Sequence, residues 1–550
     1  MSKMSNNVKG QRSVEKSKRV TNWMGGNSYE LNPLDTLKMI TASSIFGEPQ
    51  YYREGEWADK KVKDGSYSVH HLVREFSLIP DKYEGKKTSD VMEQAIDDAL
   101  DYDYAATLEW ARTLRKDFWM RLNPQIVMVR AATHPGRVAF TEANPGKFKE
   151  INMEVMSRLD EPASQLTYWL FKHKTKKNIP SLLKRSWASR IEKASRYQIA
   201  KYKNAGIGLI DTVRVSHASS PLVDELMKTG TIEVAEDNST WERLSSAGKT
   251  WTEILDTIKV PHMALLRNLR NIFAEINDAG KAKEILQQLK DGVSEGKQFP
   301  YRYYTAIQVL STAPINHKSL VMDALEECID IAREALPKLS GKTMCLSDNS
   351  GSAWGALNSE YGSVTVAEIG NLSSILTAQN SDEGYVGIFG DRLTEIPVSK
   401  RNGALTQAKT ARDKGKGVGG GTENGIWLFF EKAIKDKEHW DNIFIYSDQQ
   451  AGHGGLFATP GDAGRLRKME MAVNQHGTAY IDVVKLVNKY RAEVNPKVNV
   501  FTVQTAGYNN VLVPETMYRT SVLYGWTGKE SVYADAMIKF WDEKDAQAKK

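Results

Sequence analysis

TMCLSDNSGSAWG (residues 343–355) is the stretch that decides the fold of the C-terminal part of this chain. A short apolar run leads into Asp348, and Ser350 and Ser352 follow at alternate positions. In open α/β sheets, ligands bind at the carboxyl ends of the strands, which is where these polar residues would lie. Carboxylate and hydroxyl oxygens are hard donors of the kind that Mg²⁺ prefers. The stretch therefore indicates an α/β domain with a divalent-cation site.

Further apolar runs alternate with helical patterns after this stretch. Strands that alternate with helices are typical of a doubly wound parallel sheet, so we expect that fold here. Asp448 ends one of these runs, which places its carboxylate at the same sheet edge as Asp348. The runs are YVGIFG (385–390), NIFIYSD (442–448) and VNVFTVQ (498–504), and the helical patterns span 364–379, 425–434 and 479–494.

A glycine run, GVGGGTENG (417–425), adds Thr422 just before a predicted helix. It matches neither phosphate-loop pattern, so no nucleotide site is predicted. The alternative is that Asp348 and Ser350 cap one helix and Thr422 caps another. We expect a Mg²⁺-type metal site formed by Asp348, Ser350, Ser352, Thr422 and Asp448.

Residues from about 88 to 335 have the 3.6-residue periodicity of successive helices, as in TSDVMEQAIDDAL (88–100). Strand patterns are few there, which predicts an all-α array of helix pairs, in the manner of a solenoid. No strict sequence period supports the repeat. We expect a basic disordered arm at 1–24, a helical-repeat module at 25–338, the α/β domain at 339–535 and a tail at 536–550.

The segment from 165 to 203 holds eleven Lys or Arg and one acid, whereas the whole chain has a net charge of +6. Local basic charge interleaved with aromatic residues fits a nucleic acid, because cations contact phosphates and rings stack on unpaired bases. The alternative is a solvated helix face. The RNA-binding candidates are Lys172, Lys174, Lys184, Arg185, Arg190, Lys193, Arg196, Lys201, Lys203, Arg214 and His217.

The bulk composition narrows the class of protein. Its 550 residues predict two or three domains. Cys328 and Cys345 have no paired spacing, so we expect neither disulfides nor a cysteine zinc site, and a reducing, cytoplasmic setting. No apolar run approaches the roughly 18 residues of a membrane span, so no membrane partner is expected. No catalytic triad or histidine metal motif is found, so we expect no enzyme.

The metal-ligand pattern resembles the metal-ion-dependent adhesion site (MIDAS) of von Willebrand factor A domains. A helical array followed by such a domain resembles the Ro 60-kDa autoantigen family of bacterial or phage type, whose helical part is called TROVE. The segments that carry this resemblance are ELNPLDTLKMITASSIFGEPQYY (30–52), IAKYKNAGIGLIDTVRVSH (199–217), VPHMALLRNLRNI (260–272) and FPYRYYTAIQVL (299–310).

The resemblance implies a monomeric ring of HEAT-like helix pairs with the A domain joining its ends. It implies that the ring binds single-stranded 3′ ends of misfolded RNAs and that its outer surface binds Y-like noncoding RNAs in a ribonucleoprotein. Bacterial members supply RNA to an exoribonuclease, polynucleotide phosphorylase. Lys201, Lys203, Arg214 and His217 match the family's RNA-contact stretch. Residues 204–206 read NAG where the family has a further cation.

We therefore expect an RNA-binding protein that acts in noncoding RNA quality control. The alternative is a protein-interaction scaffold that grips an acidic partner residue through the metal, with RNA incidental. A metal-dependent nuclease is disfavoured, because one metal with hydroxyl ligands lacks the two-metal carboxylate cluster of nucleases.

Overall fold

The structure is a computed structural model of the chain. It describes residues 17–21, 26–42, 88–118, 120–202, 208–235, 239–296, 298, 300–355, 365–420, 423–449, 451, 467–469, 472–473, 479–505, 510–514, 516–524 and 530–547.

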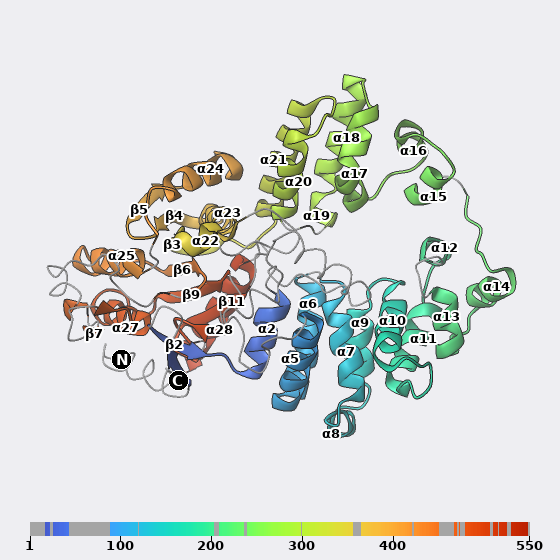
Figure 1. Cartoon of the computed structure of the whole chain (residues 1–550), viewed down its shortest axis with the longest axis horizontal. Coiled ribbons are helices and arrows are strands. Elements are labelled where there is room, and N and C mark those ends of the chain that lie inside the picture. Colours follow the sequence, from blue (N-terminus) through green and yellow to red (C-terminus); the bar gives the residue numbers. More distant parts are fainter. Residues whose placement is uncertain are drawn as a thin grey trace.

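The N-terminal part is an array of antiparallel helices that follows an arc, beginning and ending at the α/β domain (Figure 1). Successive helices pack side by side, as α6 does on α7 and α9. The helical array predicted from the periodicity is thus confirmed, and its arc agrees with the ring that the family resemblance implies (Figure 1). Its helices are α2 (Pro33–Ala42), α5 (Thr88–Tyr102), α6 (Tyr104–Lys116), α7 (Asn123–Thr133), α8 (Arg137–Ala143), α9 (Lys147–Val155), α10 (Glu161–His173), α11 (Ser181–Glu192), α12 (Arg196–Tyr202), α13 (Leu209–Ser216), α14 (Pro221–Thr229), α15 (Trp241–Ser246), α16 (Trp251–Thr257), α17 (His262–Glu275), α18 (Ala279–Asp291), α19 (Val293–Gly296), α20 (Pro300–Thr312) and α21 (Lys318–Glu334).

A buried amide cluster fixes how α7, α9, α10 and α11 pack. The Gln165 amide nitrogen donates to Gln125 Oε1 at 2.8 Å and to Asn152 Oδ1 at 2.7 Å. Gln165 Oε1 accepts from Trp187 Nε1 at 2.7 Å. All four side chains are fully buried. Since buried polar groups need partners, only one register of these four helices satisfies the cluster.

The C-terminal part is built on a six-stranded sheet in the order β11-β9-β6-β3-β4-β5. Five neighbouring strands are parallel, and β5 lies antiparallel to β4 at one edge. The predicted doubly wound sheet is confirmed, although β5 and β11 were not anticipated. The strands are β3 (Leu339–Asp348), β4 (Ser381–Phe389), β5 (Leu393–Pro397), β6 (Asn442–Ser447), β9 (Asn499–Gln504) and β11 (Thr520–Tyr524), with a separate hairpin of β7 (Ala472–Val473) and β8 (Ala479–Tyr480).

Helices cover both faces of the sheet because side chains alternate along each strand. Leu346 of β3 packs in one core with α25 and α27, whereas its neighbour Cys345 packs in another with α23, α24 and α28. The first core runs on into α2–α11 and the second into α16–α21. The remaining elements are α22 (Gly351–Gly355), α23 (Val366–Gln379), α24 (Ala404–Gly415), α25 (Glu423–Lys435), α27 (Val483–Glu493) and α28 (Glu530–Gln547).

A small sheet joins the two ends of the chain. β2 (Asn27–Glu30) lies between β1 (Arg19–Thr21) and β10 (Asn510–Val511), antiparallel to both. The buried Ser28 hydroxyl contacts Asn510 Oδ1 and Val511 O, both at 2.9 Å. The arm expected to be disordered at 1–24 therefore contains a paired strand at its end.

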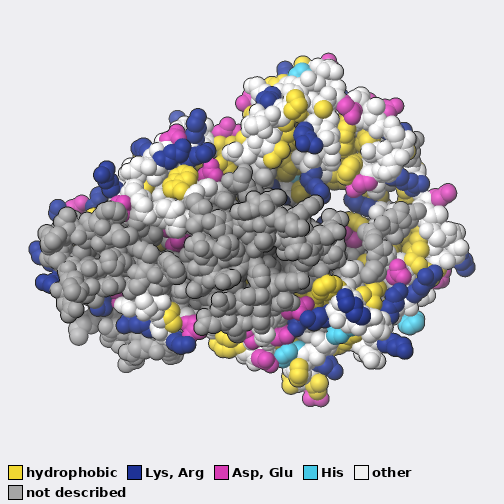
Figure 2. Space-filling view, in the orientation of Figure 1, with side chains coloured by type: hydrophobic (Ala, Val, Ile, Leu, Met, Phe, Trp, Pro, Cys, Tyr) yellow, Lys and Arg dark blue, Asp and Glu magenta, His cyan; other side chains and the backbone are white. Residues whose placement is uncertain are grey.

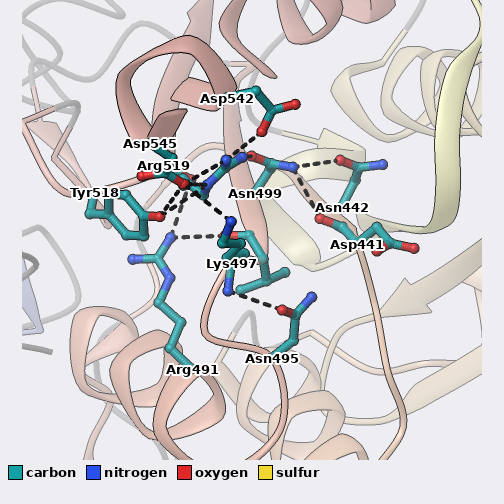
Figure 3. Close-up of polar contacts among 11 residues, drawn as sticks. Asp441, Asn442, Arg491, Asn495, Lys497, Asn499, Tyr518, Arg519, Asp542 and Asp545 are labelled. Atoms are coloured by element: carbon teal, nitrogen blue, oxygen red, sulfur yellow. Dashed lines mark hydrogen bonds and ion pairs between the residues drawn. The ribbon is translucent and has the colours of Figure 1, made fainter. Parts of the chain in front are cut away.

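The C-terminal helix α28 is part of the α/β domain, so the expectation of a separate tail from residue 536 is corrected. Arg519, only 3% exposed, pairs with Asp545 at 2.8 Å and with Asp542, and donates to Asn499 Oδ1 at 2.9 Å (Figure 3). Tyr533 of α28 also packs against Phe118 of the helical ring. None of the helices that the structure describes combines the length and the apolar character of a membrane-spanning segment.

The Gln165→Leu variant should lose about 3 kcal/mol of unfolding free energy, because several buried donors and acceptors would lose their partner. Chemical denaturation against the wild type measures this. Gln287→Leu is the control, since Gln287 is exposed on α18 and should change stability by less than about 0.5 kcal/mol. Equal stability of the two variants would show that the amide cluster does not fix the helices.

The Arg519→Ala variant should loosen α28, because Asp545 would lose its buried cation. Hydrogen exchange should become faster in α28 but not in β3 or β6. Lys539→Ala is the control: its pair with Asp535 lies on the same helix with 70% of the lysine side chain exposed, and such pairs contribute about 0.2–1 kcal/mol. Unchanged protection of α28 in Arg519→Ala would contradict the role of Arg519.

Candidate functional site: the carboxyl edge of the sheet and the basic surface of the ring

The sheet topology brings Asp348 and Asp448 together. β3 ends at Asp348, and Asp448 directly follows the neighbouring parallel strand β6, in which Tyr446 lies opposite Ser347. The chain continues from β3 to β4 on one side and returns to β6 on the other. Such a switch point leaves a crevice at the carboxyl ends of the strands, where ligands bind in open α/β sheets.

Four of the five predicted metal ligands form one hydrogen-bonded cluster at this edge. The Ser352 hydroxyl donates to Asp448 Oδ2 at 2.8 Å, and the Ser350 and Ser352 hydroxyls lie 3.2 Å apart. The Ser350 backbone N–H donates to Asp348 Oδ1 at 2.9 Å. Asp348, Ser350 and Asp448 are buried. Thr422, the fifth predicted ligand, lies outside the described residues.

Residues that the sequence analysis missed hold this loop in place. The Ser447 hydroxyl donates to Asp348 Oδ2 at 2.7 Å. Asn371 of α23 exchanges two hydrogen bonds with the Asn349 side chain, at 2.8 and 2.9 Å, and accepts from Ser347. The signal for Ser447 was its place before the strand-ending Asp448, but nothing in the sequence links Asn371 to Asn349.

Gln449 turns the chain sharply after Asp448. Its φ is +64°, in the left-handed region that a side chain other than glycine rarely adopts. The residue is fully buried, and its amide contacts the carbonyls of Ile445 and Val503 and the N–H of Leu512, each at 3.4 Å. Such strain persists only where surrounding contacts fix it, and it is common at functional sites.

The electrostatics of the cluster suit a bound cation. Burial raises the pKa of the Asp348 carboxyl to about 7, and the negative charge of Asp448 adds to this rise, while hydrogen bonds from Ser350 and Ser447 oppose it. A divalent ion would compensate both buried carboxylates. Within the described ranges, no three His, Cys, Asp or Glu side chains gather, so two carboxylates plus hydroxyls is the donor set available. That oxygen-only set fits Mg²⁺.

Two of the predicted RNA-binding cations hold helices together in the structure. Arg190 is 9% exposed, and its guanidinium donates to the carbonyls of Met156 and Ser157 at 2.9 and 3.0 Å. Burial lowers its pKa. Lys172 pairs at 2.5 Å with Glu93, a largely buried carboxylate of α5. Both cations stabilise helix packing, so we remove them from the RNA-binding set.

Acids from distant parts of the sequence neutralise other cations of the segment. Lys176 lies 3.2 Å from Asp211. Arg196 contacts both carboxylate oxygens of Glu225, at 2.7 and 2.8 Å, and this hydrogen bonding lowers the pKa of Glu225. Counting charges along the sequence missed these partners. The pairs are exposed, however, and such pairs contribute only about 0.2–1 kcal/mol, so a phosphate can replace the carboxylate.

A basic surface remains on α11–α13. Figure 2 shows Lys and Arg side chains gathered over this part of the ring. Lys174 and His217 end α10 and α13 in left-handed conformations and are exposed. Lys203 lies outside the described residues. Within the described part of the chain, the cations on α11–α13 without a carboxylate at ion-pair distance are Lys184, Arg185, Lys193, Lys201 and Arg214.

The aromatic residues of the segment are also of two kinds, buried in the core or accessible at the surface. Tyr168, Trp169 and Trp187 are buried in the core. Tyr197 is 39% exposed on α12, and the Lys201 ammonium lies 5.8 Å from its ring centroid and 5.6 Å from that of Tyr202. This part of the segment combines an exposed ring with a cation, which is the pairing that unpaired bases require. The Lys174 ammonium also lies 4.7 Å from the ring centroid of Phe171, which is partly buried.

Comparison with known proteins supports this architecture. The TROVE domain family model matches residues 224–342, which span α14 to the start of β3. The crystal structure of the Ro (RSR) protein of Deinococcus radiodurans matches with a TM-score of 0.54 and 14% sequence identity, over 81% of this chain and 93% of that one. No curated protein matches the sequence. The TROVE match and the shared fold confirm the resemblance to the Ro family that the sequence indicates.

Proposed function

We propose that this protein binds RNA without catalysing a reaction on it. The observation that carries the proposal is the group of cations on α11–α13 that no described carboxylate neutralises. The later part of the same helical ring, residues 224–342, matches the TROVE model. These five cations suit the phosphates of a folded RNA, because each contact releases a counterion. Tyr197 beside Lys201 supplies a stacking platform for an unpaired base.

The ring offers an outer surface and a centre, and we assign a different part of the RNA to each. We propose that a small structured noncoding RNA, Y-like in its use of the outer surface, binds at α11–α13. In the same proposal the ring receives the single-stranded 3′ tail of a misfolded RNA. The protein would then act in RNA quality control in the cytoplasm as a monomeric ribonucleoprotein that presents RNA to an exoribonuclease such as polynucleotide phosphorylase. The family resemblance supports these finer roles.

We further propose that Asp348, Ser350, Ser352 and Asp448, with Thr422, hold a divalent cation, with Mg²⁺ the best fit. When bound, the ion would present an electrophilic position to an anionic oxygen, because three hydroxyl ligands add no negative charge. The chain's own contribution is to hold the ligands: Ser447 orients Asp348, and Asn371 fixes the loop through Asn349.

The same cluster supports a second candidate function, a scaffold that grips an acidic residue of a partner protein. Its supporting observation is the donor set at the carboxyl ends of β3 and β6, whose hydroxyls add no negative charge and would leave a bound ion electrophilic. In that case partner capture should be lost on chelation and in Asp348→Ala. Capture that survives both would rule the scaffold out.

The first prediction concerns the basic surface. The triple variant Lys184→Gln, Arg185→Gln, Lys193→Gln should bind a hairpin with a 3′ tail about tenfold or more weakly at low salt. Its plot of log affinity against log salt should be shallower by about 1 per cation removed. Fluorescence anisotropy across a salt series measures both, and the wild type should prefer the tailed hairpin to a blunt one.

The control for this experiment is Lys283→Gln, Lys435→Gln, Lys539→Gln, which removes the same charge from exposed positions on α18, α25 and α28. It should retain most of the affinity. Equal losses in both triple variants would mean that net charge, rather than the α11–α13 surface, determines binding. A wild type that binds neither RNA at moderate salt would refute the RNA-binding proposal.

The second prediction concerns the metal. Mg²⁺ should raise the melting temperature of the wild type, because a ligand that binds only the folded state stabilises it. Asp348→Asn should abolish this Mg²⁺-dependent rise. Asp413→Asn, which removes an exposed carboxylate from the nearby α24, is the control and should keep it. The readout is the difference with and without Mg²⁺, since removing a buried charge changes the baseline stability as well. The same rise in Asp348→Asn would contradict the assigned ligands.

A further inference from the structure

A second concentration of positive charge lies on α24 and the loop before it, which no part of the proposed function uses. Residues 400–418 contain six Lys or Arg and one acid, a net charge of +5 over 19 residues. This is about the density of the 165–203 segment, which carries +10 over 39 residues. We call its cations the α24 surface: Lys400, Arg401, Lys409, Arg412, Lys414 and Lys416.

The α24 surface keeps most of its charge in the folded protein. Arg412 pairs with Glu368 of α23 at 3.1 Å, and Lys400 donates to the Asp382 carbonyl at 3.1 Å. Lys409, Lys414 and Lys416 are exposed and have no ion pair with any described carboxylate. Tertiary packing therefore leaves two lysines of α24 and the lysine that caps its C-terminus without a neutralising acid among the described residues.

The packing of α24 forces these lysines outward. The helix buries one face through Ala404, Ala408, Ala411 and Gly415 against α23 and the sheet. Lys409 and Lys416 are seven residues apart, so they lie on one side of the helix about 10 Å apart along its axis. That is about one Debye length at 0.1 M salt, so their fields add. Figure 2 shows the dark blue side chains grouped over α24, apart from those over α11–α13.

The chemistry of the α24 surface favours phosphates over a protein partner. The cores of protein interfaces are enriched in aromatic residues and depleted of lysine. The large hydrophobic residues that the structure describes as exposed lie elsewhere, at Tyr102, Val138, Tyr197, Met227, Val309 and Phe540. Lysines without an accessible ring can contact the phosphate backbone but cannot stack on unpaired bases. A base-paired RNA, whose bases are already stacked, needs only the first kind of contact.

The α24 surface also ends beside the metal-ligand loop. Gly415 closes α24 against the Asn349 side chain, and a side chain at this position would collide with it. Four residues after Lys416, the Gly420 carbonyl accepts from the Gly351 N–H at 2.9 Å. The cations and the oxygen-lined edge therefore form one continuous region of the α/β domain.

We propose that the α24 surface binds the phosphate backbone of a base-paired RNA stem. This inference rests on the proposed RNA-binding function and assigns the stem, as distinct from the single-stranded tail, to the α/β domain. The α/β domain then takes part in RNA recognition as well as joining the ends of the ring.

The test compares the full-length triple variant Lys409→Gln, Lys414→Gln, Lys416→Gln with the wild type on two RNAs. One is a hairpin with a long stem and a 3′ tail, and the other is the tail alone as an unpaired oligonucleotide. The hairpin should bind the variant about tenfold more weakly at low salt, with a salt slope shallower by about 2 to 3. The affinity for the oligonucleotide should not change. Lys283→Gln, Lys435→Gln, Lys539→Gln is the charge-matched control and should behave as wild type.

The other outcomes separate this inference from the function on which it rests. If wild type binds both RNAs and the α24 variant matches it on the hairpin, the α24 surface does not bind RNA and only this inference fails. Equal weakening on hairpin and oligonucleotide would overturn the assignment to a stem. If wild type binds neither RNA, the proposed function itself fails. Circular dichroism of the variants checks that each is folded, which the exposure of the three lysines leads us to expect.

Discussion

The pairing of β2 with β10 is the constraint on which the rest of the structure depends. It joins residues almost five hundred positions apart, and the buried Ser28 hydroxyl contacts Asn510 and Val511 within it. An array of helices that packs only with its neighbours would otherwise be an open solenoid with two free ends. Closing so long a loop has a large entropic cost, which must be offset by the cores that extend from the sheet into both ends of the helical array.

This closure also lies next to the candidate metal site. Leu512, just after β10, donates to the buried Gln449 amide at 3.4 Å, and Gln449 follows Asp448 directly. The strained turn at Gln449 is therefore held by the same segment that joins the chain ends. A change at the metal loop and a change at the ring closure would share this contact, which gives the two parts of the molecule a physical connection.

The charged residues show how much of a binding surface can be predicted from the sequence alone. The basic segment at 165–203 was found from composition, but the partners Glu93, Asp211 and Glu225 came from other helices and neutralise three of its cations. Arg190 proved to be a packing residue, because its guanidinium bonds two backbone carbonyls. The α24 surface escaped notice because its segment is short, yet Arg412 is the one of its six cations that pairs with a described carboxylate. Net local charge predicts a partner only after tertiary ion pairs are known.

The sequence by itself determined the element types and the residues with metal-ligand chemistry, because both depend on local patterns. Strand and helix periodicity predicted the parallel sheet, and polar residues at strand ends placed Asp348 and Asp448 at one edge. Only the tertiary structure decided which groups support that edge, as Asn371 does for Asn349. It also decided that α28 packs onto the α/β domain through the pair of Arg519 and Asp545, and that β2 pairs with β10 to close the ring. These contacts join residues that are distant in sequence, and no local pattern records the pairing of one particular side chain with another.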